Sequence, residues 1–305
     1  MKTALILGIS GNFGAQMAMA LHEENWQIRA LVRDKSKAPN WVSSENVWVG
    51  DASDEKAVEQ AAAGVDLIVY GVNPTYDRWP QDALRLLEPS VRVAEKHNLR
   101  LLFPGNVYNF APSSEPITED TSMSPVTEKG VIRVNMEQRL RLASQQGASI
   151  TIVRAGDYIG PKTQLGWLDA ILKQKQDRAT MQLPHDEQHE HFWCYLPDFC
   201  ANTAKLMSLP QSRFEVWHDE GLTLSQKDWQ QAFLANGQLL KTTRFSWWLL
   251  KVIGLFKPVI GEVVKMQYLW QQPVILSGKK MRKALGENFQ STPLSEILLT
   301  LQTGQ

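Results

Sequence analysis

The stretch Met1–Ala15, MKTALILGISGNFGA, decides the fold of this chain. Its apolar run Thr3–Leu7 has the length of a buried strand, and Gly8, Gly11 and Gly14 follow it at three-residue spacing. Apolar residues then recur at helical spacing, so the stretch predicts a strand, a glycine turn and a helix. Such a turn lets the backbone approach a pyrophosphate, and the helix N-terminus presents unpaired N–H groups to it. We therefore predict a dinucleotide site here, the alternative being a tight turn that binds no ligand.

The composition of the 305 residues is typical of a globular protein, with 43% hydrophobic and 21% charged residues. Lys and Arg together number 32, as do Asp and Glu, and this balance argues against a protein that binds nucleic acid by charge. Cys194 and Cys200 are too few for a disulfide framework, so we expect a reducing, cytoplasmic location. Glycines interrupt the apolar run that follows Lys2, so we expect no signal peptide.

The longest apolar stretch is Phe245–Phe256, FSWWLLKVIGLF. It contains Lys251 and Gly254 and is too short to span a bilayer, so we expect no integral membrane segment. Its tryptophans suit a membrane interface or a protein partner. The plainer interpretation, which we favour, is a helix packed in the core or over a substrate cleft.

Strand and helix patterns alternate through the first half of the chain. After the opening strand, further strands are predicted at 28–32, 47–49, 65–72, 99–103 and 150–153, with helices between them. This alternation predicts an α/β fold with a Rossmann-type, doubly wound parallel sheet and helices on both faces. Ligands of such sheets bind at the carboxyl ends of the strands.

The second half loses this alternation and is richer in tryptophan. Helices are predicted near 165–175, 198–209, 225–234 and 245–270, strands near 192–195 and 214–217, and a last helix with Thr292 as its N-cap. We expect a dinucleotide-binding domain over residues 1–155 and a smaller C-terminal substrate lobe over residues 156–305, partly interleaved with it.

The residues after the predicted strands indicate how a dinucleotide would be held. An acid after the second strand accepts the ribose 2′-OH of NAD, whereas an arginine there favours the 2′-phosphate of NADP. Arg33 occupies this place and Asp34 follows it, so we favour NADP and leave NAD open. Asp51, after the third strand, could hydrogen-bond the adenine amino group. The cofactor-binding residues predicted at these turns are Gly8, Ser10, Gly11, Asn12, Phe13, Gly14, Arg33, Asp51, Ala52, Gly71 and Val72.

A series of motifs occurs in one order along the chain. They are Gly8-x-x-Gly11-x-x-Gly14, Arg33, Gly50-Asp51-x-x-Asp54, Asn106-Val107-Tyr108 and Arg154-x-Gly156-Asp157-Tyr158-Ile159-Gly160-Pro161. Together they resemble the short-chain dehydrogenase/reductase superfamily, in its extended or atypical branch, usually called NAD-dependent epimerase/dehydratase-like. Leu196-Pro197-Asp198 resembles the family's V-x-D step, where the acid is expected to cap a helix. The resemblance implies a nicotinamide cofactor and a small-molecule substrate, and it leaves a homodimer open.

Active members of that family carry a Tyr-x-x-x-Lys pair on the helix after the fifth strand, and a serine or threonine at the end of that strand. The tyrosine exchanges a proton with the substrate oxygen, and the lysine lowers its pKa and holds the nicotinamide ribose. This chain lacks the pair: alignment over 125–137 places Lys129 at the tyrosine position and Arg133 at the lysine position. Asn106 follows the strand in place of the serine or threonine. The resemblance implies that Lys129 also touches the cofactor.

Three interpretations stay open. In the first, which we favour, the chain is an NADP-dependent oxidoreductase or epimerase/dehydratase-like enzyme acting on a small carbonyl or hydroxyl compound. Lys129 or Tyr108 would supply the proton. Asn106 would bind the substrate oxygen, and Arg133 would hold cofactor or substrate charge. In the second, the chain binds NADP(H) without catalysis, as a sensor or scaffold. In the third, the fold serves partner binding, for instance as an assembly factor, through its tryptophan-rich lobe.

Histidines gather in the segment 184–194, PHDEQHEHFWC. His189 and His191 would share one side of a strand, a spacing that can ligate zinc. Acids and amides crowd the segment as they do a solvated loop, so we predict no metal site. These histidines could instead line the substrate site. An aromatic pocket would result if the following residues converge: Tyr76, Trp79, Tyr158, Trp167, His191 and Trp193.

Overall fold

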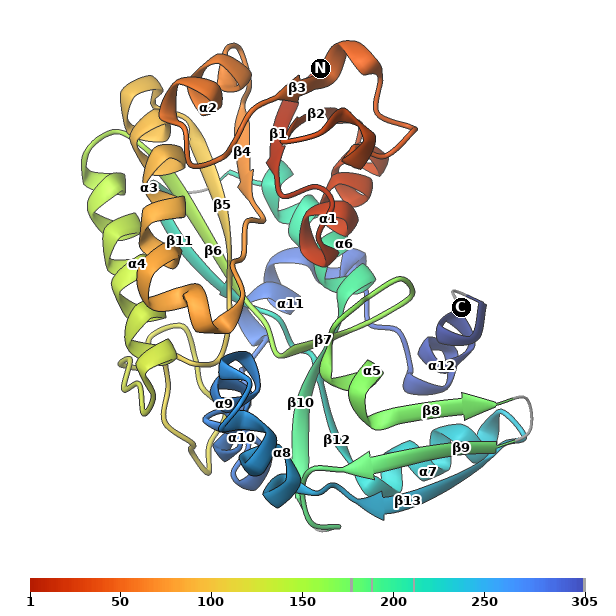
Figure 1. The fold of residues 1–305 in the computed structure, drawn as a ribbon. Helices are drawn as coiled ribbons and strands as arrows, with labels where there is room; N and C mark the ends of the chain where they lie inside the picture. Colours follow the sequence, from red (N-terminus) through yellow and green to blue (C-terminus); the bar gives the residue numbers. More distant parts are fainter. Residues whose placement is uncertain (176–177, 188, 211, 304–305) are drawn as a thin grey trace.

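A seven-stranded parallel sheet lies at the centre of the computed structural model, which describes residues 1–175, 178–187, 189–210 and 212–303 (Figure 1). Its strands are β1 (Thr3–Leu7), β2 (Gln27–Val32), β3 (Val47–Val49), β4 (Leu67–Tyr70), β5 (Arg100–Gly105), β6 (Ser149–Arg154) and β11 (Phe214–His218). Their order is β11-β6-β5-β4-β1-β2-β3, so the direction of winding reverses between β1 and β4. Ligands of doubly wound sheets bind beside such a reversal, and the glycine turn after β1 lies there.

Helices cover both faces of this sheet because its strands are apolar on both sides. Leu5 and Leu7 of β1 pack into one cluster of buried side chains, whereas Ala4 and Ile6, which alternate with them, pack into another. One face carries α2 (Glu55–Ala62), α3 (Trp79–His97) and α4 (Glu128–Gln145), and the other carries α1 (Asn12–Glu23), α6 (Leu196–Ser208) and α11 (Lys279–Leu285) (Figure 1). The predicted fold class is confirmed.

The C-terminal half forms a lobe with two small sheets, ordered β12-β10-β7 and β13-β9-β8. The strands are β7 (Asp157–Ile159), β8 (Leu172–Lys175), β9 (Arg178–Leu183), β10 (Glu190–Tyr195), β12 (Leu222–Ser225) and β13 (Leu239–Arg244). The helices packed with them are α5 (Trp167–Ile171), α7 (Gln226–Ala235) and α12 (Leu294–Thr303). A third apolar cluster, rich in tryptophan, fills this lobe. The same half also returns β11 to the main sheet, where it pairs with β6.

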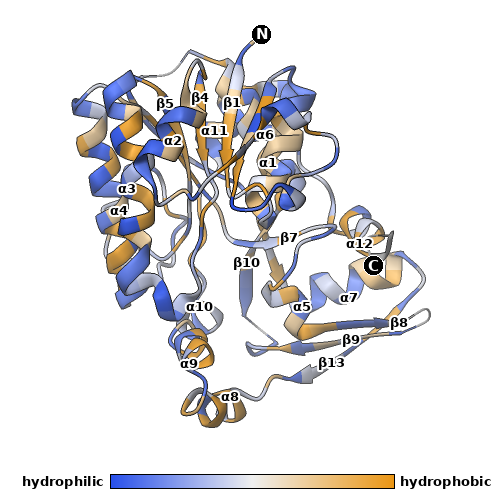
Figure 2. Cartoon of the chain, turned by 45° about the horizontal axis from the view of Figure 1, so that its top comes forward, coloured by the Kyte–Doolittle hydropathy of each residue, from blue (hydrophilic) through white to orange (hydrophobic). Residues whose placement is uncertain are grey.

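Three short helices follow the lobe strands: α8 (Trp247–Gly254), α9 (Pro258–Val264) and α10 (Tyr268–Gln271). They lie below the main sheet, beside the lobe (Figures 1 and 2). Four 3₁₀ turns complete the described elements: η1 (Lys35–Lys37), η2 (Ser44–Asn46), η3 (Tyr76–Arg78) and η4 (Gly286–Asn288). None of the helices in the described ranges combines the length and apolar character that a bilayer crossing requires.

Several expectations for the second half are wrong. The helix predicted near 165–175 ends at Ile171, and β8 follows, paired with β9. The helix predicted at 245–270 is broken into three, because Pro258 begins α9 and Gly254 and Gly261 bring α8 and α9 into close contact. The strands β9 and β13 were not predicted. The alternation in β9 (RATMQL) is regular, whereas that in β13 (LLKTTR) is weak, and the two strands pair with each other in the lobe.

The predicted caps of two later helices are also wrong. Asp198 lies in the first turn of α6, but its carboxylate accepts hydrogen bonds from the backbone N–H of Thr292 (2.5 Å) and its hydroxyl (2.9 Å). Thr292 therefore ties the start of the last helix to α6 instead of capping its own helix. By contrast, Asp54 caps α2 as predicted, accepting from the N–H of Lys56.

We expected the apolar stretch 245–256 to be buried, but several of its side chains face solvent. Trp248, Leu255 and Phe256 are 68%, 81% and 82% exposed. Figure 2 shows apolar residues along α8 and α9 at the edge of the molecule. The inner side does pack over the molecule, since Phe245 and Trp247 contact Trp167 in the lobe.

Candidate functional site

Three glycines hold the turn after β1 against the end of β4. A Cβ on Gly14 would lie 2.2 Å from the carbonyl oxygen of Gly8, and a Cβ on Gly8 would lie 2.5 Å from that of Gly71. Gly8 also has φ of +80°, a conformation that residues with a side chain rarely adopt. The turn after β1 and the segment after β4 therefore pack backbone to backbone, at the point where the strand order reverses.

The N-terminus of α1 is open toward this turn. Gly11 is its N-cap and makes no capping bond through a side chain, and the first turn carries no acid. A Cβ on Gly11 would meet only the Gly8 carbonyl oxygen, at 3.4 Å, so this position faces open space. Unpaired N–H groups and the positive end of the helix dipole suit a pyrophosphate, so the residues present fit a dinucleotide.

The neighbouring residues of the turn take different roles. Ser10 is exposed. The side chain of Asn12 exchanges two hydrogen bonds with the backbone of Gln164 (2.8 and 3.1 Å), which ties the turn to the loop after β7. Phe13 is buried and packs against Phe199, so its backbone alone is left for a ligand.

At the end of β2, Arg33 is exposed to solvent, whereas Asp34 is engaged in the turn that follows. The Asp34 carboxylate accepts from the backbone N–H and hydroxyl of Ser36, and these bonds lower its pKa. Asp51 accepts from the N–H of Ser53 (2.8 Å), which lowers its pKa, and the charge of Arg33 adds to this. The structure thus brings Arg33 and Asp51 to one edge of the sheet.

A lysine is buried beside the ends of β4 and β5. Lys129, in the first turn of α4, donates to the carboxylate of Glu262 on α9, and its ammonium lies 5.1 Å from the ring centre of Tyr76. Burial opposes ionisation of Glu262, but hydrogen bonds from Lys129 and Lys265 outweigh it and lower its pKa. Next to Lys129, a Cβ on Gly130 would lie 2.3 Å from the Tyr108 carbonyl oxygen, so α4 packs closely on this loop.

Two tyrosines pair beneath this lysine. The hydroxyls of Tyr76 and Tyr108 are 2.6 Å apart. Burial raises the pKa of Tyr76 to about 12 and raises that of Tyr108 well above its usual value. Asn106 uses its side-chain oxygen to accept the N–H of Tyr108 (3.0 Å), which shapes the loop after β5.

Arg133 lies one turn further along α4. Its guanidinium donates to the carbonyl oxygen of Pro104 (3.0 Å) and lies 4.7 Å from the ring centre of Trp79. Burial lowers its pKa. Within the described part of the chain, its buried Nε has no hydrogen-bond partner, so it remains able to bind an oxygen of a ligand.

A histidine and an acid from the lobe form a pair that sequence reasoning missed. His191 Nε2 is 2.7 Å from a carboxylate oxygen of Asp157, and its ring stacks on Trp270 with centres 3.5 Å apart. The sequence showed Asp157 only as part of a motif, although its place three residues after the end of β6 could have marked it. Glu262 carried no such signal, because it lies far from Lys129 in the sequence.

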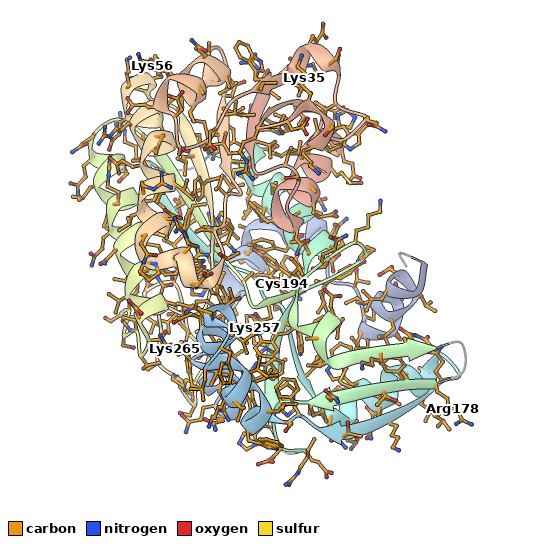
Figure 3. The ribbon with its side chains drawn as sticks, viewed as in Figure 1. Lys35, Lys56, Arg178, Cys194, Lys257 and Lys265 are labelled. Carbon is orange, nitrogen blue, oxygen red and sulfur yellow. The ribbon has the colours of Figure 1, made fainter. Side chains whose placement is uncertain are left out.

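The proposed aromatic pocket is only partly formed. Tyr76 contacts Trp79 beside the main sheet, whereas Trp167 and Trp193 pack around Trp270 in the lobe. Tyr158 packs against Phe199 instead. The described residues include no group of three or more His, Cys, Asp or Glu side chains that could hold a metal ion. Cys194, labelled inside the molecule in Figure 3, is a buried free thiol, as is Cys200.

Comparisons with known proteins agree with this geometry. A model of the NAD(P)H-binding family matches residues 8–163. A protein of Synechocystis named "putative dihydroflavonol 4-reductase" is 28% identical over 170 residues, covering 51% of this chain and 49% of that protein. This chain thus matches only about half the length of that relative.

Solved structures share the whole fold at low identity. The NAD complex of the UDP-glucose 4-epimerase of Thermus thermophilus has a TM-score of 0.69 at 15% identity, covering 98% of both chains. The dTDP-glucose 4,6-dehydratase of Streptomyces venezuelae, with NAD and TYD bound, has a TM-score of 0.70 at 16% identity, covering 99% of this chain and 97% of that one. The resemblance to the extended short-chain dehydrogenase/reductase fold is confirmed.

Proposed function

This chain belongs to the NAD(P)H-binding family, and on that premise we propose that it is an NADP-dependent oxidoreductase or epimerase/dehydratase-like enzyme. Its substrate is a small carbonyl or hydroxyl compound. The solved structures of similar fold include an epimerase and a dehydratase, and the curated relative carries the name of a reductase. Fold alone does not select among these reactions, so the residues of the site must support the choice.

The observation that carries the proposal is the buried cation of Lys129. It lies beside Tyr76, which follows β4, and its neighbour Gly130 packs on Tyr108, which follows β5. The ammonium thus stands at the edge of the sheet that carries the glycine turn. A positively charged donor at this edge can give a proton to a carbonyl oxygen that gains negative charge.

We assign the proton to Lys129 in preference to Tyr108. When bound, the nicotinamide supplies or accepts the hydride at the substrate carbon. Lys129 Nζ gives a proton to the carbonyl oxygen during reduction and takes one back from the hydroxyl during oxidation. Burial raises the pKa of Tyr108, which makes its hydroxyl a poorer proton donor than an ordinary tyrosine, and that hydroxyl is already bonded to Tyr76.

Other residues position the reactants in this proposal. The backbone of the glycine turn and the N-terminus of α1 hold the pyrophosphate, and Arg33 binds the 2′-phosphate of NADP. Asn106, whose side-chain oxygen accepts the N–H of Tyr108, binds the substrate oxygen through its amide NH₂ group. The unpaired Nε of Arg133 holds an oxygen of the cofactor or substrate.

The test compares Lys129→Met with Lys265→Met in NADPH oxidation across a panel of aldehydes and ketones. Lys265 is the matched control, because its ammonium also bonds Glu262 (2.5 Å) but lies on the surface. We expect Lys129→Met to lower kcat by roughly 10²- to 10⁴-fold with NADPH affinity changed only slightly. Lys265→Met should retain kcat. Unchanged turnover in Lys129→Met would remove Lys129 from the chemistry.

A second candidate function is an NADP(H)-binding protein without catalysis. The ion pair favours it, because Glu262 covers the Lys129 ammonium and a substrate reaches that group only when α9 gives way. Stoichiometric NADPH binding with no turnover of any carbonyl in the panel would support this alternative. Absence of NADPH binding would contradict both candidates and favour a partner-binding role.

A further inference from the structure

The helices α8 and α9 present one continuous apolar face to solvent. Exposed apolar side chains lie along α8, the turn after it and the start of α9: Trp248, Leu249, Val252, Leu255, Phe256 and Val259. Two of them, Leu255 and Phe256, are more than four-fifths exposed at the turn between the helices. A single exposed apolar side chain is common, but six on one face mark a binding surface.

The segment that forms this face carries positive charges only. From Trp229 to Gly261 the chain contains no Asp or Glu, and its charged residues are Lys241, Arg244, Lys251 and Lys257. All four are exposed. Two acids close to these helices are engaged: Asp186 faces Arg244 at 3.9 Å, and Glu262 bonds Lys129 and Lys265. The face is therefore apolar in its centre and cationic at its rim.

We propose that this face docks on the surface of an anionic lipid bilayer. Interfacial helices combine Trp, Leu and Phe on one side with lysines at the boundary, whose long stems let the charge reach the headgroups. Lys251 lies between Trp248 and Val252 in the sequence and at the border of the apolar face. A second copy of this chain fits poorly, since the two cationic rims would repel one another.

The structure presents this face in a fixed position. A Cβ on Gly254 would lie 2.9 Å from Cα of Gly261, so the two helices pack backbone to backbone. The inner side of α9 is held by the Lys129–Glu262 ion pair, and Trp247 donates to the carbonyl oxygen of Pro184 (2.8 Å). The pair of helices α8 and α9 is thus already ordered before it meets a membrane. The ion pair with Lys129 joins α9 to the candidate site.

The test is sedimentation of the full-length protein with vesicles of phosphatidylcholine, alone or mixed with phosphatidylglycerol. We expect binding to the mixed vesicles and little to the neutral ones. Leu255→Ser with Phe256→Ser should weaken binding about tenfold or more, because the apolar side chains no longer enter the interface. Lys251→Gln with Lys257→Gln should weaken it about fivefold for each lost cation.

Matched controls lie elsewhere on the surface. Leu142 and Leu234 are 52% and 64% exposed, and their serine variants should bind as the unchanged protein does. Lys56, which Figure 3 shows far from Lys257 and Lys265, supplies the charge control as Lys56→Gln. Thermal unfolding confirms that each variant is folded.

Quenching by brominated lipids gives an independent readout. Quenching of tryptophan fluorescence should fall in Trp248→Phe. The proposal is overturned if the protein does not sediment with anionic vesicles, or if the apolar variants bind as well as the controls. It is also overturned if light scattering shows a dimer that Leu255→Ser with Phe256→Ser abolishes, which would assign the face to a second copy. None of these readouts depends on the catalytic proposal.

Discussion

Two adjacent side chains at the end of β2, Arg33 and Asp34, bear on whether the site binds NADP or NAD. Asp34 is used locally, because its carboxylate accepts two hydrogen bonds from Ser36. Arg33 is exposed beside it. From the sequence, one residue of register separated an NAD site from an NADP site, and the local bonds of Asp34 support the role proposed for Arg33.

Substitution of Arg33 tests this preference. Arg33→Gln should weaken NADPH binding by roughly ten- to a hundredfold, because it removes a charge-assisted hydrogen bond to phosphate. NADH affinity should hardly change, since NADH lacks the 2′-phosphate. Fluorescence titration with both cofactors measures the two affinities. Lys37→Gln, a nearby exposed cation, is the control, and equal losses for NADPH and NADH in Arg33→Gln would contradict the assignment.

At the scale of elements, the backbones of three segments are in van der Waals contact at the glycine turn: the end of β1, the start of α1 and the end of β4. The glycine spacing predicted the turn, because only residues without a side chain allow such an approach. The contact with Gly71 after β4 needed the tertiary structure, since it joins segments about sixty residues apart. The three glycines of the motif also differ: Gly8 and Gly14 serve packing, whereas Gly11 faces open space.

Alanine at two of these glycines should therefore have different effects. Gly14→Ala places a Cβ 2.2 Å from a carbonyl oxygen and should destabilise the protein by about 2 kcal/mol or more. Gly11→Ala should retain the thermal stability but weaken NADPH binding, because its Cβ enters the space left for the pyrophosphate. Thermal unfolding and NADPH titration distinguish the two. Equal stability of both variants would show that the turn tolerates the contact.

At the scale of the whole molecule, the junction between the main sheet and the lobe holds buried groups whose protonation differs from their usual state. Burial raises the pKa of Asp219, just after β11, to about 7, and the charge of Asp198 adds to this. Burial and the charge of Arg154 lower the pKa of His218 to about 3. Both effects follow from the return of β11 to the sheet, which buries this segment.

The two groups make stability depend on pH in opposite directions. Between its ordinary pKa of 3.8 and about 7, Asp219 binds a proton in the folded state but not in the unfolded state, so stability falls as pH rises. Between about 3 and its ordinary 6.5, His218 binds a proton only in the unfolded state, so its contribution rises with pH. Above pH 6.5, of the two groups only Asp219 still makes the stability depend on pH.

Asp219→Asn isolates this effect. The amide cannot ionise, so the gain in unfolding free energy over the unchanged protein should be larger near pH 8 than near pH 5, by the order of a few kcal/mol. Denaturant unfolding at both pH values measures it. Glu45→Gln, at an exposed acid before β3 on the opposite edge of the main sheet from β11, should show no such pH-dependent gain. A difference independent of pH would mean that Asp219 is already ionised in the folded protein.

The sequence by itself determined the parallel sheet, the glycine turn and the candidate cofactor edge. These depend on local periodicity and on residue types with narrow backbone roles, which are readable without knowledge of distant contacts. Tertiary structure alone decided the partner of Lys129, the Asp157–His191 pair, the strands β9 and β13, and the outward face of α8. Each of these depends on which distant segment lies alongside, and burial, pairing and charge compensation are set by that neighbour rather than by the residue itself.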